Sequence, residues 1–176
     1  IVRALLGNIK NIGSGRRPAG ASTITQQVAK NMLLSSELSY TRKIKEAILA
    51  TRIENAFSKD HILELYLNEI YLGNRSYGVA AAALNYFGKS LNELNIEEIA
   101  YLAALPKGPN NYHPKRKYEA AVGRRNWVLD RMSEEGYISE EEAAAAKEKP
   151  LTTVERSGGF LKNAEYFSEE VRREIN

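Results

Sequence analysis

The sequence contains no cysteine and only two histidines, His61 and His113. The absence of cysteine excludes disulfides, thiolate metal sites and a cysteine nucleophile, and two histidines exclude a histidine-rich metal site. No apolar run approaches the roughly 20 residues that a helix needs to span a bilayer, and no signal peptide is recognisable. The chain starts at Ile1 in what reads as the middle of a helix. We therefore expect a fragment of a longer protein, with any membrane anchor outside this chain.

The composition is that of an ordinary globular protein, with 43% hydrophobic and 27% charged residues among 176. This length suits one domain with a core, or one domain with an appendage. The net charge of +3 is weakly basic. It would suit an anionic partner such as a phosphate, a membrane surface or a nucleic acid.

Almost every periodic segment has the helical period, which predicts a mainly α fold with six to nine helices. The short segment 151–154 is the only plausible strand. We expect one helix to begin at a capping box formed by Thr23 and Gln26, and another to follow a serine cap at residue 58. The predicted ranges of the helices from residue 41 onwards are 41 to about 57, 59 to about 72, 79–87, 95 or 96 to 105, 117–135 and 139–147.

Apolar side chains occupy two opposite faces of the predicted helix 41–57. Ile44 and Ile48 share one face, whereas Ile53 and Phe57 share the other. A helix that is apolar on two sides is normally sandwiched in a core. Glu46 lies on the second face, so its carboxylate is predicted to point into a partly desolvated place.

Two cations, Arg42 and Lys43, are neighbours of Glu46 on this helix. A carboxylate beside fixed cations suits the transfer of a group away from a pyrophosphate, because cations stabilise the leaving-group charge. The alternative is a surface salt bridge one helical turn apart, which is common and weak. The residues alone leave both interpretations open.

The segment STITQQ at 22–27 offers hydroxyl and amide side chains at a helix start, followed by Lys30. It could form a hydrogen-bonding wall for a polyhydroxylated or phosphorylated ligand, since a helix N-terminus also offers free N–H groups to anions. Composition alone favours a simple N-cap and an exposed polar face. Lys59, Tyr66, Asn68, Arg124 and Arg125 are each, taken singly, ordinary helix residues.

Taken in order and at their spacings, four segments together resemble motifs of the peptidoglycan glycosyltransferase family, the glycosyltransferase module of class A penicillin-binding proteins. These segments are GASTITQQ at 20–27, RKIKE at 42–46, KDHILELYLN at 59–68 and RRNWVL at 124–129. The resemblance covers residues 1–150 and lacks the family's N-terminal motif. Residues 151–176 resemble a linker and helix leading towards a transpeptidase domain, which implies a bifunctional parent.

The resemblance implies a lysozyme-like helical fold with a globular lobe and a small membrane-apposed lobe. It implies polymerisation of lipid II on the outer face of the bacterial cytoplasmic membrane, with inversion at C1 and release of undecaprenyl pyrophosphate. The implied partners are lipid II, the growing lipid-linked glycan chain, the membrane surface and a moenomycin-type inhibitor, but no nucleic acid. It implies no obligatory cofactor and no protein metal ligands, although a divalent cation (Mg or Mn) is possible.

The same resemblance assigns roles to individual residues. Glu46 would assist departure of the pyrophosphate, whose charge Arg42 and Lys43 would stabilise. Positions that match contacts to donor sugars and phosphates are Ser22, Thr23, Gln26, Gln27 and Lys30. Positions that match cleft-supporting residues are Lys59, Tyr66, Asn68, Arg124 and Arg125, the last two bracing the surroundings of Glu46. Candidates for a lipid-facing surface are Met32, Leu33, Leu34 and Leu38.

Two departures from the family pattern affect these expectations. The general-base glutamate of the first motif would lie upstream of Ile1, and no acid precedes Glu37. Because general-base assistance is worth roughly 10²–10⁴-fold, we predict that the fragment alone is inactive. Leu38 stands where many relatives carry a basic residue, which puts one phosphate contact in doubt.

Two other functions remain alternatives at this point. A lysozyme-like glycan hydrolase would need paired carboxylates at catalytic separation. A helical module that binds anions or nucleic acid could use Arg16, Arg17, Arg124 and Arg125, although acids are interspersed and no continuous basic stripe is present.

Overall fold

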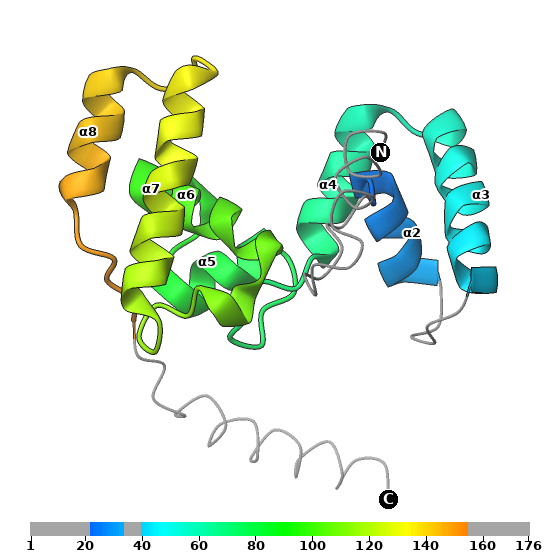
Figure 1. The fold of residues 1–176 in the computed structure, drawn as a ribbon, viewed down its shortest axis with the longest axis horizontal. Helices are drawn as coiled ribbons and strands as arrows, with labels where there is room; N and C mark the ends of the chain where they lie inside the picture. The colour runs from blue at the N-terminus through cyan, green and yellow to red at the C-terminus, as the bar shows by residue number, and fades with distance from the viewer. Residues whose placement is uncertain (1–21, 34–39, 155–176) are drawn as a thin grey trace, which may run out of the picture. The chain divides into compact units, whose positions relative to one another are not determined.

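The computed structural model describes residues 22–33 and 40–154, and it divides the chain into two compact units. The first unit comprises the described residues up to Tyr71 together with Tyr77–Val79, and the second comprises Leu72–Ser76 and the described residues from Ala80. The mainly α prediction is confirmed, because the described part contains helices and a single isolated bridge but no strand (Figure 1). None of the described helices is long and apolar enough to cross a membrane.

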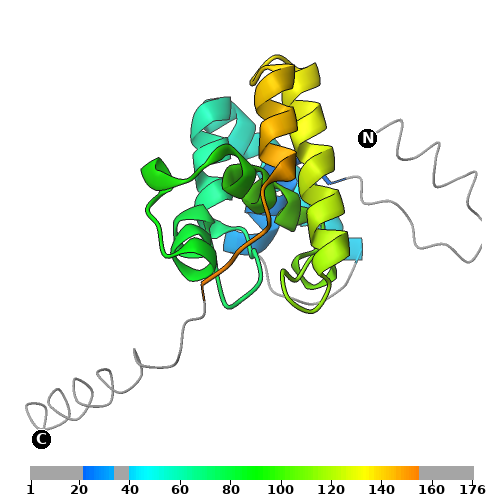
Figure 2. The same ribbon diagram turned by 90° about the vertical axis from the view of Figure 1, so that its left-hand side faces the viewer.

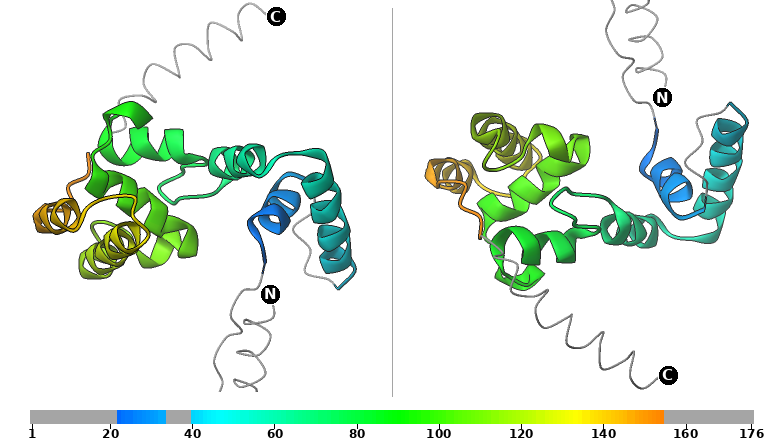
Figure 3. Two further views of the ribbon diagram at one scale, coloured as in Figure 1. Left: turned by 90° about the horizontal axis from the view of Figure 1, so that it is seen from above. Right: turned by 90° about the horizontal axis from the view of Figure 1, so that it is seen from below.

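The first unit is built from three helices, α2 (Ile24–Leu33), α3 (Tyr40–Ala56) and α4 (Lys59–Glu69). Helix α2 packs against both α3 and α4, and Figure 3 shows α2 beside α3 in both views. Each helix contributes buried side chains to the shared core, which includes Val28, Ala29, Ala50, Ile53, Ile62 and Tyr66. The predicted cap of α4 is confirmed, since the Ser58 side chain accepts from the backbone of His61.

The prediction that α3 is sandwiched on two faces is wrong for the described residues. Ile44 and Ile48 are 62% and 52% exposed, and Phe57 is also exposed. The buried stripe instead runs through Glu46, Ala50 and Ile53. Residue 44 lies about 200° from residue 46 around a helix, so packing α2 on that stripe leaves Ile44 and Ile48 facing away.

Helix α2 has one apolar stripe by spacing, formed by Ile24, Val28 and Met32, but its buried face differs from that stripe. Ile24 is exposed, whereas Thr25, Val28 and Ala29 are buried. The side chain of Met32 lies outside what the structure describes. Position 25 faces inward because it sits three residues before Val28, on the side of α2 that meets α3 and α4.

The second unit contains α5 (Val79–Phe87), α6 (Ile96–Ala104), α7 (Tyr118–Glu134) and α8 (Glu140–Glu148). Three short 3₁₀ turns complete it at Leu91–Glu93, Leu105–Lys107 and Pro109–Asn111. Figure 1 and Figure 2 both show α7 and α8 side by side as a helical hairpin. The predicted end of the helix 117–135 is confirmed to within a residue, because Gly136 has a φ of +76° and Tyr137 N donates to Met132 O at 2.8 Å.

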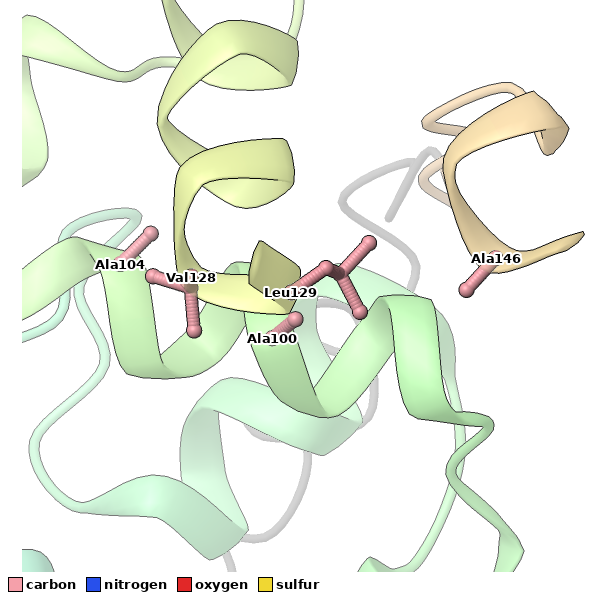
Figure 4. Packing of buried hydrophobic residues seen from close by; sticks show 5 residues of the cluster. All are labelled: Ala100, Ala104, Val128, Leu129 and Ala146. Atoms are coloured by element: carbon pink, nitrogen blue, oxygen red, sulfur yellow. The ribbon is translucent and has the colours of Figure 1, made fainter. Parts of the chain in front are cut away.

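The core of the second unit lies where α7 crosses α6 and meets α8. Small alanines on α6 and α8 allow the close approach of Val128 and Leu129 from α7 (Figure 4). Beside it, the ring of Tyr101 meets Tyr86 edge-on at 5.5 Å. Burial raises the pKa of Tyr101 above its ordinary value.

Two further predictions about chain segments are corrected. Helix α4 ends at Glu69 rather than near residue 72, because Ile70 is extended and its carbonyl accepts from Gly78 N at 2.9 Å. Residues 151–154 form no strand. Two separate hydrogen bonds hold this segment instead. Leu151 N donates to the Tyr118 hydroxyl, and Val154 N donates to Tyr86 O. The predicted domain boundary at 150 stays a prediction, since residues 155–176 lie outside the described part.

Candidate active site

The start of α2 is organised by the predicted capping box. Thr23 N donates to Gln26 Oε1, and Gln26 N donates to Thr23 Oγ1, each at 3.1 Å. These reciprocal bonds satisfy two backbone groups that a helix start leaves open. Thr23 and Gln26 therefore have a structural role, and their expected contact with a substrate stays a prediction.

The first turns of α3 bury one carboxylate. The Glu46 side chain is 2% exposed, and the Lys43 ammonium donates to its Oε1 one turn earlier on the helix. Burial of a lone carboxylate is costly, whereas burial of a paired one is tolerated. The expectation that Glu46 points into a desolvated place is thus confirmed for the carboxylate itself, and the surface salt bridge does not describe it.

Lys43 also connects the two predicted motifs in space. Its Nζ donates to Ser22 Oγ at 2.8 Å, across 21 residues of sequence. The result is a chain of contacts from the Ser22 hydroxyl through the ammonium to the Glu46 carboxylate. These contacts thus join the segments 20–27 and 42–46, which are separate in the sequence.

Lys43 is partly open to solvent although its partner is not. The Lys43 side chain is 53% exposed, whereas the Glu46 side chain that it contacts is buried. An ammonium has three N–H donors, and within the described residues Ser22 and Glu46 engage two of them. The third can meet an anion from solvent, at a position that the buried carboxylate fixes. The geometry thus suits the binding of a phosphate oxygen.

The other residues predicted for the donor side lie on the same two helices. Arg42 is half-buried in the first turn of α3, and Gln27 is half-buried on α2. Lys30 is exposed one turn after Gln26. Their contacts with a ligand stay predictions. Leu34 and Leu38 lie outside the described residues, as do the side chains of Met32 and Leu33, so the lipid-facing prediction is untested.

A cavity of about 480 Å³ opens in the first unit where α2 begins and α4 follows α3. Its lining includes the predicted residues Thr23 and Lys59 but neither Lys43 nor Glu46. Its walls are mainly apolar, with Ile24, Phe57 and Leu63 exposed. The Glu46 carboxylate therefore does not line this cavity.

The two other predicted residues of the 59–68 motif, Tyr66 and Asn68, differ in burial. Tyr66 is buried in the core of the first unit, and burial raises its pKa. This placement agrees with a supporting role. Asn68 is exposed near the end of the helix, and its backbone carbonyl lies against Gly78.

The two arginines of the last motif have unlike surroundings. The Arg124 guanidinium lies 3.9 Å from the centroid of the Trp127 ring, and its buried Nε has no hydrogen-bond partner among the described residues. Arg125 is fully buried, and burial lowers its pKa from the ordinary value. The bracing of Glu46 by these arginines stays a prediction.

The guanidinium of Arg125 ties two helices of its unit together. Its Nη1 donates to the carbonyl of Lys149 at 2.7 Å, and its Nη2 to that of Lys147 at 3.0 Å. Both Nε and Nη2 donate to Asn126 Oδ1. Arg125 therefore caps the C-terminal end of α8, a role that the sequence did not reveal because the carbonyls belong to residues 22 and 24 positions away.

The described residues contain no group of three or more His, Cys, Asp or Glu side chains that could hold a metal ion. The only acid in the Ser22–Lys43–Glu46 chain is Glu46, and its Oε1 is engaged by an ammonium. A role for a divalent cation stays an untested prediction.

Comparison with known proteins places this geometry in context. A family model described as transglycosylase matches residues 1–133. The chain is 50% identical to penicillin-binding protein 1A of Rickettsia bellii over 175 residues, which are 99% of this chain and 22% of that protein. It is 52% identical to penicillin-binding protein 1A of Aquifex aeolicus over 172 residues, which are 98% of this chain and 23% of that protein.

A solved structure agrees with these similarities. A crystal structure of penicillin-binding protein 1A from Haemophilus influenzae matches with a TM-score of 0.55 at 41% identity, covering 91% of this chain and 21% of that chain. The chain spans about a fifth of the length of the curated relatives that it matches.

Proposed function

The chain belongs to the transglycosylase family, and on this premise we propose that it carries the core of a peptidoglycan glycosyltransferase that polymerises lipid II. The observation that carries the proposal is the contact chain Ser22–Lys43–Glu46, which joins two of the family's motifs around one exposed ammonium. A hydrolase would need a second carboxylate at catalytic separation. The described partner of Glu46 is a cation, which fits pyrophosphate departure better.

The proposed reaction is a displacement at C1 of the donor sugar. The 4-hydroxyl of the acceptor forms the new C–O bond, and the bond from C1 to the undecaprenyl pyrophosphate breaks with inversion. The leaving group keeps the electron pair, and a general base accepts the hydroxyl proton. We assign that base to the glutamate of the first family motif, upstream of Ile1.

Within this chain, Lys43 is the group that meets the pyrophosphate. Charge accumulates on the bridging oxygen as the C1–O bond breaks, and a fixed ammonium stabilises it. Glu46 acts through Lys43, because its buried carboxylate holds the ammonium in place. Ser22 fixes the ammonium from the other side. Positioning by two partners removes the cost of ordering a long flexible side chain in the transition state.

The location and partners follow from the same proposal. The substrate and the growing chain are lipid-linked, so the enzyme works at the outer face of the cytoplasmic membrane, and a transpeptidase domain follows in the parent protein. The names of the relatives, penicillin-binding protein 1A, support this proposal. A moenomycin-type inhibitor is the expected ligand of the donor side.

The first test uses a longer polypeptide that extends upstream through the first motif, assayed for polymerisation of labelled lipid II. We expect Lys43→Met and Glu46→Gln each to lower the rate by roughly 10²–10³-fold, the usual loss for one transition-state donor. Since Glu46 acts through Lys43, the double variant should be no slower than the slower single variant. Arg52→Met, which removes an exposed cation from the same helix, is the matched control and should retain full rate.

The second test needs no catalysis and uses the 176-residue chain itself. Binding of a moenomycin-type inhibitor should weaken at least about tenfold in Lys43→Met and stay unchanged in Arg52→Met. Equal binding by both variants would contradict the role of Lys43. Full polymerisation by Glu46→Gln, with its fold intact, would contradict the role of Glu46.

A further inference from the structure

Two tyrosine rings lie together on the surface of the first unit. Tyr71 and Tyr77 face each other across the isolated antiparallel bridge. Their ring centroids are 5.0 Å apart and the planes are inclined by 45°. Tyr77 is 67% exposed and Tyr71 is 38% exposed. Together the rings form an open, angled aromatic surface, which we call the Tyr71–Tyr77 platform.

The backbone beneath the platform is held rigidly. Gly78 N donates to Ile70 O at 2.9 Å, which pins the residue after Tyr77 to the residue before Tyr71. A Cβ at Gly78 would lie 2.3 Å from the carbonyl oxygen of Asn68, so the two segments touch backbone to backbone. The rings are thus displayed at a fixed spacing. Tyrosines on a rigid support bind ligands at little cost in conformational entropy.

We propose that the Tyr71–Tyr77 platform binds the sugar rings of a glycan strand, outside the Ser22–Lys43–Glu46 site. One face of an N-acetylhexosamine ring presents C–H groups that stack on an aromatic face, while its hydroxyls and acetamido groups bind polar groups. Tyrosine supplies both an apolar ring and a hydroxyl that donates and accepts. The inference rests on the proposed function, because a glycan polymerase has such a strand as its product.

The residues beside the platform favour a glycan over a lipid surface. Asn68 and Glu69, at the end of α4, are both exposed and precede Tyr71 by three and two positions, respectively. Amide and carboxylate groups bind sugar hydroxyls. Membrane-binding helices instead combine apolar side chains with several Lys and Arg residues, whereas the exposed charges between residues 68 and 77 are one acid, Glu69, and one base, Arg75. The chemistry at this place therefore fits a hydroxyl-rich polymer.

The test measures binding of a lipid-free saccharide to the 176-residue chain. The probe is tetra-N-acetylchitotetraose, titrated against protein with ¹³C-labelled tyrosine rings and followed by NMR. We expect the ring signals of Tyr71 and Tyr77 to shift on titration. Tyr77→Ala should weaken binding about tenfold or more, whereas Tyr77→Phe, which keeps the ring, should stay within about threefold of the wild type. Tyr137→Ala, at an 80% exposed tyrosine in the second unit, is the matched control and should bind normally.

Several results would overturn the inference. The absence of ring shifts at millimolar saccharide would do so, as would equal binding by Tyr77→Ala and the wild type. Loss of binding to phosphatidylglycerol vesicles in Tyr77→Ala, with no saccharide binding by the wild type, would assign the platform to lipid instead. The ring shifts of the unaltered chain keep the test decisive even if Tyr77→Ala fails to fold.

The outcomes also separate this inference from the proposed function. Tyr77-dependent saccharide binding together with no lipid II polymerisation by the longer polypeptide would refute the proposed function alone. Polymerisation together with saccharide binding that ignores Tyr77 would refute the platform alone.

Discussion

The contrast between Arg124 and Arg125 yields a prediction that the sequence motif alone could not make. We replace each arginine by methionine, which keeps the length and apolar character of the side chain but removes the guanidinium. Arg125→Met leaves the carbonyls of Lys147 and Lys149 without their donor at the C-terminal end of α8. Arg124→Met removes a stacking contact with Trp127.

The expected magnitudes follow from these contacts. Leaving a buried acceptor unsatisfied costs about 1–3 kcal/mol, so the two carbonyls freed by Arg125→Met, whose bonds are partly buried, should together lower the free energy of unfolding by about 2–6 kcal/mol. A cation–π contact at a partly exposed site is worth about 0.5–1 kcal/mol, which sets the cost of Arg124→Met. The two variants should therefore differ by at least about 1 kcal/mol, or roughly fivefold in the folding equilibrium.

Urea unfolding of the chain, followed by far-ultraviolet circular dichroism, measures both free energies. Amide hydrogen exchange adds a local reading, since Arg125→Met should speed exchange in α8 before it affects the first unit. If Arg125→Met unfolds within about 1 kcal/mol of the wild type, or costs no more than Arg124→Met, the assignment of Arg125 as the cap of α8 is refuted.

Three further changes test local features. Gly78→Ala places a side chain at a φ of +78° against the Asn68 carbonyl, so the free energy of unfolding should fall by at least about 2 kcal/mol in urea denaturation. Ser139→Ala removes the cap bonded to Glu142 and should cost about 1 kcal/mol in the same assay, whereas Ser139→Asn should restore it. Burial and neighbouring cations lower the pKa of His113 in the folded chain. As the pH drops below the unfolded-state pKa of about 6.5, the unfolded chain therefore binds the proton more readily than the folded chain, and the free energy of unfolding decreases as the pH is lowered. His113→Gln should flatten that fall in urea midpoints compared between pH 7.5 and pH 5.

The positions of the helices were largely predictable because their boundaries depend on neighbouring residues. The caps at Thr23, Ser58 and Ser139 act on backbone groups three residues away, and Gly136 ends α7 through its own φ. Such signals involve residues that are close together in the sequence. The exception is the end of α4, where Gly78 bonds to Ile70 from eight residues away and no local stop signal precedes it.

Burial was less predictable than secondary structure. Periodicity gave α3 two apolar faces, and only the packing of α2 decided that Ala50 and Ile53 are covered while Ile44 and Ile48 are not. The cost of leaving an isoleucine exposed is small enough for a fold to tolerate when no neighbouring element covers that side.

The candidate site divides in the same way between sequence and structure. By itself the sequence determined the mainly α fold and placed Arg42 and Lys43 close to Glu46, because both conclusions rest on neighbours about one helical turn apart. Only the tertiary structure decided that Ser22 meets Lys43, that Arg125 caps α8 and that the tyrosine pair stays exposed. These contacts join residues that only packing brings together, and packing depends on the shapes of whole helices rather than on any local pattern.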